Sequence, residues 1–479
     1  MITAERMAVV DRNAAALGVP QKQLMESSGN AVARVVREVS EEDSQIALVC
    51  GRGNNGGDAL VAARFLKDYD VTVHLLGRPE TITTDIAREN WEALQDAAYE
   101  TQVVRDSADL ALDSPDVVVD AMLGTGITGS LREPEATAAA AINDADATVV
   151  AVDVPSGVDA NTGDAAAGAV EADHVVTFHD IKPGLEGIET TVTVADIGIP
   201  AAAETFAGPG DLTRLTRKSA SHKGDHGEVL VVGGGPYTGA PALAAQAALR
   251  AGADLVRVAC PNNVADEIQG YSENLIVRPF EGERFTPEAV EHVQSLAAAH
   301  DVTVLGPGLG DAQATLTAVS DFLAGFSGTA VVDADALQVV PETETEADLL
   351  CTPHQGELRK MGGETSDDWR EREGLVTEFA AEVGHTLLVK GDYDVVSDGE
   401  TTRVGRTGNP GMTVGGTGDV LAGATGALAC VLPAVDAAAI AAYANGRAGD
   451  SVVDRQGYGL VATDLLDELP LALWGDDDE

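Results

Sequence analysis

The stretch GMTVGGTGDVLAG, residues 411–423, places closely spaced glycines directly before a run of apolar and small residues. A glycine-rich turn that opens an apolar helix brings backbone N–H groups together at the helix N-terminus, where they bind an anion such as phosphate. Asp419 falls in the first turn of the predicted helix Thr417–Val431. It can act there as a base toward a hydroxyl group that attacks a phosphate, or it can simply cap the helix. The stretch predicts a phosphoryl-transfer site on an α/β fold.

Short β-branched runs precede this helix and alternate with Ala-rich stretches, a pattern typical of parallel βαβ units. The predicted strands of this half are Val229–Val232, Val256–Ala259, Val302–Leu305, Ala330–Val332 and Thr386–Val389, with further helices at Ala240–Ala251 and Ala437–Val453. Its polar and glycine-rich motifs are HKG (222–224), GGG (233–235), GAPAL (239–243), GPGLG (306–310), DADAL (333–337), TPHQGE (352–357) and KG (390–391). Because the carboxyl ends of parallel strands line the ligand crevice of such a sheet, we expect these motifs to meet at one edge.

A second α/β series occupies the first half of the chain. Its predicted strands are Ile46–Cys50, Val71–Leu76, Val117–Met122, Thr148–Val154 and His174–Phe178, with a helix at Ala59–Lys67. The segment 201–217 interrupts the alternation with Gly208-Pro209-Gly210 and no apolar period. We place the domain boundary near residue 213, which predicts a Rossmann-like parallel-sheet domain over residues 1–213 and a second α/β domain over residues 214–479.

The chain is strongly acidic, with 78 Asp and Glu against 30 Lys and Arg and a formal net charge of −48. The acidic residues are spread along the whole chain, which argues against nucleic acid or an anionic membrane as a partner. Only seven of the basic residues are lysine. This composition favours adaptation to a high-salt cytoplasm over an ordinary acidic protein.

The four cysteines lie far apart and form no CxxC or Cys/His cluster, so they predict neither a zinc site nor a disulfide framework. The first residues contain no apolar signal region, and no apolar stretch is long enough to span a membrane. We therefore expect a cytoplasmic protein whose partners are small molecules and further copies of itself.

The motif GRGNNGGD, residues 51–58, follows the first predicted strand and precedes a helix, with Asp58 expected at the helix start. The glycines lack the spacing of a dinucleotide fingerprint, so a capped strand–helix turn is an equal alternative to a ligand site. The carboxamides of Asn54 and Asn55 supply both hydrogen-bond donors and acceptors.

Two more polar strand ends, DAMLGTG (120–126) and DVPSG (153–157), run into predicted helix starts. Asn55, Asp120 and Ser156 would then meet at neighbouring strand ends. Three oxygen ligands, of which one is charged, suit a monovalent cation better than Zn²⁺.

In their order, HKG, GAPAL, GPGLG, DADAL, TPHQGE, KG and GGTGD resemble the ribokinase-like ADP/ATP-dependent NAD(P)H-hydrate dehydratase family over residues 214–479. That family phosphorylates the C6 hydroxyl of NADHX and NADPHX, which are reduced nicotinamide cofactors that have gained water. Phosphate then leaves with help from the ring nitrogen. The resemblance implies ADP as co-substrate, AMP and phosphate as products, and Mg²⁺ to screen the phosphate charge.

The same resemblance implies roles for individual residues. Asp419 is expected to be the catalytic base, with Ala240, Gly308 and His354 beside it in the substrate site. The residues expected to hold the nucleotide are Lys390, Gly391, Asp392, Tyr393, Asp394 and Gly418.

The motifs LME (24–26), GRGNNGGD, DAMLGTG and DVPSG, together with Thr177-Phe178 and Lys182-Pro183-Gly184, resemble NAD(P)H-hydrate epimerase over residues 1–213. That family interconverts the R and S forms at C6. The resemblance implies Asp153 as general acid or base with Lys182 in support, and Asn55, Asp120 and Ser156 as K⁺ ligands. The implied substrate contacts are Asn54, Asn55, Gly56, Gly57, Asp58, Gly124, Thr125, Gly126, Ile127, Thr128, Gly129, Ser130, Asp153 and Lys182.

The two resemblances fit together, because spontaneous hydration makes both epimers while the dehydratase acts on S alone, and they predict a bifunctional NAD(P)H-hydrate repair enzyme. The chain departs from the family patterns at Asp394, where a Thr is usual, and at Asn445, where a His is frequent. It also has Ala59 where a Gly is usual, and its methyl group is expected to crowd a ligand mildly. The alternative is a ribokinase-like vitamin kinase with a non-catalytic N-terminal binding module.

Overall fold

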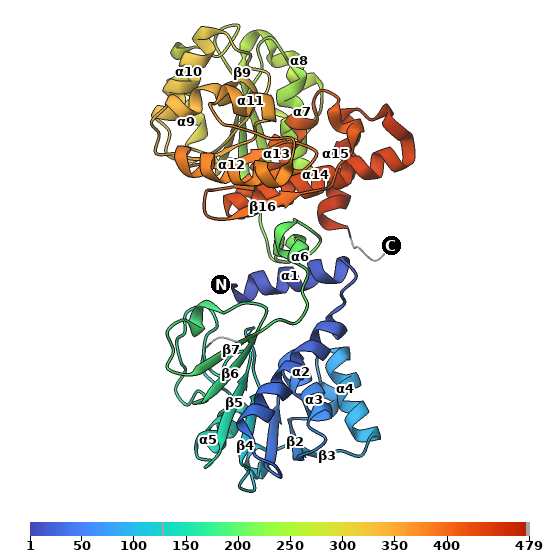
Figure 1. Ribbon diagram of the computed structural model, residues 1–479. Coiled ribbons are helices and arrows are strands. Elements are labelled where there is room, and N and C mark those ends of the chain that lie inside the picture. The colour runs from blue at the N-terminus through green and yellow to red at the C-terminus, as the bar shows by residue number, and fades with distance from the viewer. Residues whose placement is uncertain (127–128, 476–479) are drawn as a thin grey trace. The chain divides into compact units, whose positions relative to one another are not determined.

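The computed structural model describes residues 1–126 and 129–475 and shows two compact units, Met1–Ala203 and Glu204–Glu479 (Figure 1). We call them the N-terminal unit and the C-terminal unit. The division falls ten residues before the boundary expected from the sequence. In the segment between the two positions, Ala207 N donates to Val404 O, and Asp211 pairs with the buried Arg403 at 2.8 Å. The irregular segment therefore belongs to the C-terminal unit, whose edge strand it covers.

The N-terminal unit is built on a seven-stranded sheet with the order β3-β2-β1-β4-β5-β6-β7, and all neighbouring strands are parallel. The strands are β1 Gln45–Cys50, β2 Asp70–Leu76, β3 Glu100–Val104, β4 Val117–Ala121, β5 Thr148–Val152, β6 His174–Phe178 and β7 Thr191–Ala195. The chain proceeds outward from β1 in one direction and from β4 in the other. The topological switch point, where such sheets bind ligands, therefore lies between β1 and β4.

Helices cover both faces of this sheet. They are α1 Ala4–Ala16, α2 Gln21–Val39, α3 Asn54–Phe65, α4 Asp85–Asp96 and α5 Glu135–Asn143, and the short helix α6 Ala201–Thr205 contains the division between the two units. Alternate strand residues point to opposite faces, so Leu48 packs with α2, α3 and α4, while Val49 packs with α5. The apolar side chains of α1 lie in the same core as Leu48, which holds this helix against the carboxyl ends of the strands.

The C-terminal unit is built on a nine-stranded sheet with the order β10-β9-β8-β11-β12-β13-β14-β15-β16. Its strands are β8 Glu228–Val232, β9 Leu255–Pro261, β10 Ile276–Phe280, β11 Val302–Leu305, β12 Thr329–Val332, β13 Asp348–Cys351, β14 Thr386–Val389, β15 Asp394–Ser397 and β16 Thr402–Gly405. The strands from β10 to β14 in this order are parallel, and β15 and β16 add antiparallel hairpins. The switch point lies between β8 and β11.

Two apolar cores flank this second sheet. Its helices are α7 Gly239–Arg250, α8 Ala265–Gly270, α9 Val290–Ala297, α10 Gln313–Ala324, α11 Gln355–Lys360, α12 Trp369–Val383, α13 Thr417–Ala429, α14 Ala434–Gln456 and α15 Ala462–Trp474. The helices α7, α13, α14 and α15 share one core, and α9, α10 and α12 share the other. A side chain at Gly423 of α13 would overlap the backbone of Ala244 in α7, so this glycine lets the two helices pack at close range.

The expected α/β architecture is confirmed, and each strand expected from the sequence is present with ends shifted by two residues or fewer. Some helix positions were wrong. The helix after β1 begins at Asn54 rather than Ala59, so Asp58 lies in its second turn instead of at its start. After β4 the helix α5 begins only at Glu135, and the connection from Asp153 to β6 contains no helix.

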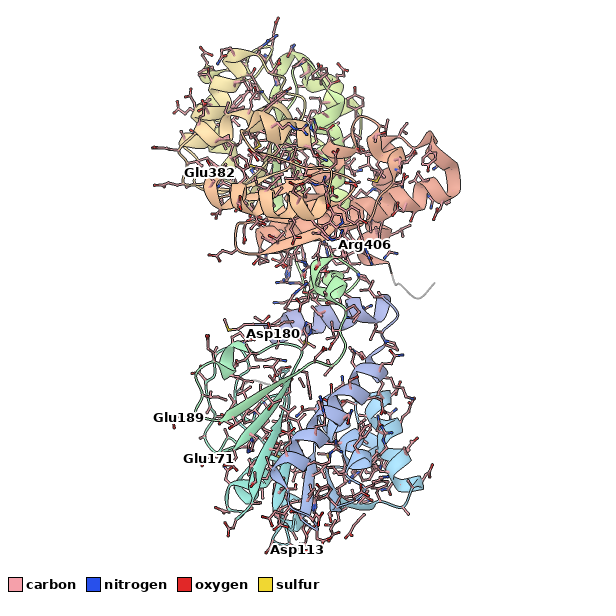
Figure 2. All side chains as sticks on the ribbon, viewed as in Figure 1. Asp113, Glu171, Asp180, Glu189, Glu382 and Arg406 are labelled. Carbon is pink, nitrogen blue, oxygen red and sulfur yellow. The ribbon has the colours of Figure 1, made fainter. Side chains whose placement is uncertain are left out.

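Acidic side chains are dispersed over both units. Asp113, Glu171 and Glu189 are exposed in the N-terminal unit and Glu382 in the C-terminal unit (Figure 2). All four cysteines are free thiols. Within residues 1–126 and 129–475, no helix combines the length and the apolar character that a membrane crossing requires.

Candidate active sites

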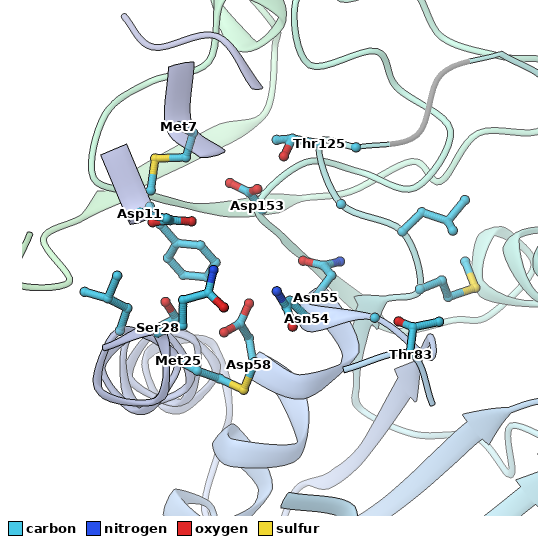
Figure 3. Close-up of a pocket in the computed structure, with 18 of the residues that line it drawn as sticks. Met7, Asp11, Met25, Ser28, Asn54, Asn55, Asp58, Thr83, Thr125 and Asp153 are labelled. Atoms are coloured by element: carbon cyan, nitrogen blue, oxygen red, sulfur yellow. The ribbon is translucent and has the colours of Figure 1, made fainter. Parts of the chain in front are cut away.

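A cleft of about 580 Å³ opens at the switch point of the N-terminal sheet (Figure 3). We call it the N-terminal cleft. The ends of β1, β4, β5 and β6 and the helices α1 and α2 line it. Its lining residues are Met7, Asp11, Gln21, Leu24, Met25, Ser28, Arg52, Gly53, Asn54, Asn55, Asp58, Thr83, Met122, Leu123, Gly124, Thr125, Gly126, Glu135, Asp153, Phe178, Lys182 and Ile197.

The turn from β1 into α3 forms one side of the cleft and requires its first glycine. A Cβ at Gly51 would overlap the carbonyl oxygen of Met122 in the neighbouring strand end. Asn54 begins α3 and is exposed to the cleft, and Asn55 follows it half-buried. The first turn of α3 therefore presents its backbone N–H groups and two carboxamides to the cleft, which suits a ligand that carries phosphate groups.

Asp120 and Ser156 meet at the ends of β4 and β5, as expected. Both residues are fully buried. Ser156 Oγ donates to one carboxylate oxygen of Asp120 at 2.6 Å and Ser156 N donates to the other at 2.8 Å. Burial raises the pKa of Asp120 to about 6, although the hydrogen bonds from Ser156 and Met122 oppose the rise.

Asn55 lies beside the same strand ends. A Cβ at Gly124 would lie 3.3 Å from the Asn55 side chain. The Asn55 Nδ2 atom is buried and has no hydrogen-bond partner within the described residues. Rotation of the Asn55 carboxamide exchanges its nitrogen and oxygen atoms. The Asn55 oxygen can therefore occupy the buried position, where it would be free to bind a cation.

Asp153 is the carboxylate at the end of β5, and two side chains hold it in place. Lys182 Nζ lies 3.1 Å from Asp153 Oδ1, and Thr177 Oγ1 donates to the same oxygen at 3.0 Å. The Lys182 side chain is fully buried, and its Nζ also donates to Phe178 O at 2.8 Å. Asp153 has the left-handed backbone conformation, with φ +67°, which is uncommon outside glycine and concentrates at functional sites.

Asp58, Asp11 and Glu135 are further carboxyl groups that line the same cleft, and the first two lie close enough to Asp153 to interact with it. Burial raises the pKa of Asp58 well above its usual range, and Asp153 and Asp11 raise it further. Burial also raises the pKa of Asp11 to about 6, with Lys182 opposing the rise and Asp153 adding to it. Asp11 was not predicted from the sequence. The signal was a carboxylate in line with Met7 and Ala14 on the apolar stripe of an N-terminal helix.

The remaining expected substrate contacts divide into four groups. Gly56 and Gly57 are buried within α3 and are not among the residues that line the cleft. Gly124, Thr125 and Gly126 line the cleft. Ile127 and Thr128 lie outside the described residues. Gly129 and Ser130 are exposed and are not among the residues that line the cleft, whereas Ala59 lies in the apolar core, so its methyl group does not crowd the cleft.

The C-terminal unit brings its polar loops together around Lys390, at the end of β14. Lys390 Nζ lies 3.0 Å from Asp333 Oδ1 and 3.9 Å from Glu357 Oε2. Thr352 Oγ1 donates to Asp333 Oδ1 at 2.7 Å. Burial lowers the pKa of Lys390, but the carboxylates of Asp333, Glu357 and Asp419 outweigh it and raise the pKa overall. The ammonium group is therefore charged and faces the space in front of three strand ends.

Asp419 lies in the first turn of α13, as expected, and it shares this space. A Cβ at the preceding Gly418 would lie 3.3 Å from Lys390 Nζ. Burial and the carboxylates of Asp333 and Glu357 together raise the pKa of Asp419 to about 7, although Lys390 opposes the rise. A carboxyl group with a pKa near neutrality at a helix N-terminus is suited to accept a proton from a substrate.

His354 lies next to Lys390, because Lys390 N donates to Pro353 O at 2.8 Å. Its Nδ1 accepts hydrogen bonds from Gly356 N at 2.8 Å and Glu357 N at 3.1 Å. Backbone N–H groups can only donate, so Nδ1 carries no proton, and the proton of the neutral ring is on Nε2. The His354 side chain is 59% exposed, and its Nε2 lies 3.6 Å from Glu357 Oε1, the nearest carboxylate to it.

Gly308 and Ala240 lie together at the switch point between β8 and β11. Gly308 has φ +74°, and a Cβ there would overlap the carbonyl oxygen of Tyr237 and lie 3.1 Å from Pro241 Cδ. Pro241 directly follows Ala240 at the start of α7. The close packing of these loops explains why glycine is needed at residue 308.

The segment from Gly391 to Asp394 forms a closed turn after Lys390. Gly391 N donates to Asp394 Oδ1 at 2.9 Å, and burial raises the pKa of Asp394 to about 6. The fully buried Arg372 side chain pairs with Asp392 at 2.9 Å, and the Tyr393 ring stacks on Trp369 with centroids 5.3 Å apart. The Asp394 side chain therefore stabilises the turn by accepting a hydrogen bond from its backbone.

Two family models match the chain. Residues 229–471 match a model described as NAD(P)H-hydrate dehydratase, and residues 21–184 match one described as YjeF-related protein N-terminus. The chain is 42% identical to the "Bifunctional NAD(P)H-hydrate repair enzyme Nnr" of Methanothermobacter thermautotrophicus, over 97% of this chain and 93% of that protein. It is also 42% identical to the protein of the same name from Archaeoglobus fulgidus, over 98% of each.

The chain belongs to the family of bifunctional NAD(P)H-hydrate repair enzymes.

Among solved structures, a ribokinase-like superfamily protein from Enterococcus faecalis is similar, with a TM-score of 0.50 and 22% identity over 56% of this chain and 95% of that chain. This likeness shows the ribokinase-like fold of the C-terminal unit. The two family-model matches include the expected site residues of both units, but Asp11 precedes the first matched range.

The residues present fit the cations that the family resemblance implies. The described residues contain no group of three or more His, Cys, Asp and Glu that could hold a metal ion. Asn55, Asp120 and Ser156 supply neutral oxygens and one carboxylate, which suits a weakly demanding monovalent ion. In the C-terminal unit, both Thr352 and Lys390 contact Oδ1 of Asp333, and this carboxylate would be the oxygen ligand available to a Mg²⁺ ion that arrives with a nucleotide.

Proposed function

We propose that this repair enzyme restores hydrated nicotinamide cofactors in two steps, one in each unit. The N-terminal unit interconverts the R and S epimers of NADHX and NADPHX, and the C-terminal unit dehydrates the S epimer at the expense of ADP. Family membership over nearly the whole chain supports both activities together. It also favours repair over a vitamin kinase, which has no use for the N-terminal cleft.

The observation that carries the C-terminal activity is the position of Asp419 beside Lys390 at the N-terminus of α13. We infer that Asp419 takes the proton from the C6 hydroxyl while the hydroxyl oxygen attacks the terminal phosphate of ADP. Lys390 and the N–H groups around Gly418 stabilise the charge on the transferred phosphoryl group. AMP leaves first, phosphate then leaves C6 as the ring nitrogen supplies its lone pair to form a C6=N1 bond, and loss of a proton from C5 restores NADH.

The substrate and the nucleotide are proposed to meet across this carboxylate. Ala240, Gly308 and His354 border the hydrated nicotinamide, with His354 Nε2–H as a donor to it. Gly391, Asp392, Tyr393 and Asp394 hold the nucleotide together with Lys390 and Gly418. When bound, Mg²⁺ screens the phosphate charge, and Asp333 is the carboxylate placed to orient its hydration shell.

In the N-terminal cleft, Asp153 is proposed as the group that exchanges a proton with the C6 oxygen. Lys182 and Thr177 hold its carboxyl group in place. The turn at Asn54–Asp58 and the residues Gly124–Gly126 bind the remainder of the cofactor. K⁺ on Asn55, Asp120 and Ser156 would fix the ends of β4 and β5 and the start of α3 relative to one another.

We propose that the enzyme works in the cytoplasm at high salt, as a homo-oligomer. Four free thiols suit a reducing compartment, and its nicotinamide and adenine nucleotide substrates belong there. The dispersed acidic surface supports salt adaptation, because self-repulsion at a net charge of −48 requires screening.

The function is tested with purified epimers. S-NADHX is incubated with Mg²⁺ and either ADP or ATP, and R-NADHX is incubated separately without nucleotide. We expect NADH, AMP and phosphate from S-NADHX with ADP, and S-NADHX from R-NADHX. The Asp419→Asn variant should lose only the first reaction and Asp153→Asn only the second. Equal turnover by both variants would refute the assignment.

A further inference from the structure

Three carboxyl groups from separate elements surround one space in the N-terminal cleft. Asp11 projects from α1, Asp58 from α3 and Asp153 from the end of β5 (Figure 3). They are close enough for each to perturb the ionisation of another, since Asp153 acts on Asp11 and both act on Asp58. Like charges this close are unfavourable, so the three groups do not all ionise together.

The contacts of Asp153 differ from those of the other two carboxyl groups. Asp153 accepts from Thr177 and pairs with the buried Lys182, and both contacts stabilise its carboxylate. Asp11 and Asp58 receive no side-chain or backbone hydrogen bond within the part of the chain that the structure describes. Their ionised forms lack such support, and both carboxyl groups face the cleft with their oxygens free for a ligand.

The chemistry of epimerisation requires more than one such group. The C6 carbon carries a hydroxyl group and is bonded to the ring nitrogen N1. To invert it, the C6–O bond on one face must break and a new C6–O bond must form on the other. An acid is needed to protonate the departing oxygen, and a base is needed to deprotonate the water that enters. Asp153 alone supplies only one of these two roles.

We propose that Asp11 is the second acid–base group of the N-terminal cleft and works as the partner of Asp153, an inference that rests on the proposed epimerase function. Asp11 gives its proton to the C6 hydroxyl, the C6–O bond breaks as the N1 lone pair forms a C6=N1 bond, and water leaves. A water molecule adds to the opposite face of C6 and gives a proton to Asp153. The substrate gains and loses one water, and one proton has moved from Asp11 to Asp153, which solvent returns.

The choice of Asp11 over Asp58 follows from their surroundings. The pKa of Asp58 is raised well above its usual range by burial, Asp153 and Asp11, all of which favour its neutral form. Burial raises the pKa of Asp11 only to about 6, because Lys182 and His179 oppose the effects of burial and Asp153. A group that titrates near neutrality is the one that can both give and take a proton during turnover.

The test follows R-to-S conversion by the full-length enzyme without nucleotide. We expect Asp11→Asn to lower kcat about 100-fold or more with little change in KM, since an acid–base group contributes about 10²–10⁴-fold to the rate. Asp11→Glu should restore part of the activity. The wild-type kcat/KM should fall above about pH 6, as Asp11 ionises, and this fall should be absent in Asp11→Asn.

Two controls separate this inference from folding and from the proposed function. Met7→Leu changes another side chain that α1 places in the cleft, and it should alter KM more than kcat. Dehydration of S-NADHX with ADP should be unchanged in Asp11→Asn, which shows that the protein is intact. If Asp11→Asn keeps the wild-type kcat and pH profile while Asp153→Asn is inactive, the inference fails and the epimerase function stands. If the wild type does not interconvert the epimers, both fail.

Discussion

Replacement of Asp419 by Asn should make the C-terminal unit more stable at neutral pH while it abolishes dehydration. Burial, Asp333 and Glu357 raise the pKa of Asp419 from 3.8 to about 7, so its ionisation costs more in the folded protein than in the unfolded chain. A tenfold change in an acid dissociation constant corresponds to about 1.4 kcal/mol, so the excess cost of ionisation is on the order of 4 kcal/mol. Asparagine has nearly the same shape and avoids this cost.

The sign of the pH dependence follows from the raised pKa. Below about pH 4 the carboxyl group is neutral in both states, and the variant and the wild type should be equally stable. Between about pH 4 and pH 7 the unfolded wild type ionises while the folded form resists, so the wild type loses stability relative to the variant. Above about pH 7 the difference should remain constant, and its order of magnitude is 4 kcal/mol.

The assay is urea denaturation of Asp419→Asn and of the parent protein at several pH values. Trp91 is the tryptophan of the N-terminal unit, whereas Trp369 and Trp474 lie in the C-terminal unit. A Trp91→Phe background therefore makes tryptophan fluorescence report on the C-terminal unit alone. If the variant and the parent have the same unfolding free energy from about pH 5 to pH 9, Asp419 has an ordinary pKa and the reasoning is refuted.

Three further predictions concern single contacts and the surface charge. Gly308→Ala, which forces a side chain toward the Tyr237 carbonyl oxygen at positive φ, should destabilise the C-terminal unit by about 1–3 kcal/mol in urea and reduce dehydration. The control Gly239→Ala adds its methyl group in open space and should be silent in both measurements. Lys182→Met removes the cation that pairs with Asp153 and should lower the free energy of unfolding of the N-terminal unit by about 2–3 kcal/mol. Adding Asp153→Asn to this variant should restore much of the lost free energy, as a double-mutant cycle will show. Raising KCl from about 0.1 M to about 1 M should raise Tm, because it shortens the Debye length from about 10 Å to 3 Å; an unchanged Tm would contradict salt adaptation.

The sequence predicted those parts of the sites that local patterns encode. Asp419 follows a glycine-rich run and Lys390 a β-branched one, and parallel strands bring their carboxyl ends to one edge, so the local pattern placed these two residues together. The same holds for Asp120 and Ser156. In each case the sequence pattern that predicts the position of a side chain lies within a few residues of that side chain. The strand β13 before His354 was not predicted, because its sequence DLLC is short and lacks β-branched residues.

The features that the sequence did not predict depend on contacts between distant segments. Asp11 meets Asp153 across more than a hundred residues of chain, and its position becomes clear only once α1 packs on the strand ends. The helix α3 begins within Asn54-Asn55-Gly56-Gly57, residues of low helix propensity, because the core around Leu60 stabilises it. The strand β3 was missed because most of its residues are exposed and polar, and neighbouring β2 defines it rather than its own pattern.

The central claim is that both units act on one pool of damaged cofactor, and a single mixed assay tests it most directly. A mixture of R- and S-NADHX is supplied with Mg²⁺ and excess ADP, and restored NADH is followed by its absorbance. The account predicts complete recovery by the wild type, faster than spontaneous epimerisation, recovery of only the S fraction by Asp153→Asn, and none by Asp419→Asn. Recovery by the wild type that stops at the S fraction, or complete recovery by Asp419→Asn, would contradict the account.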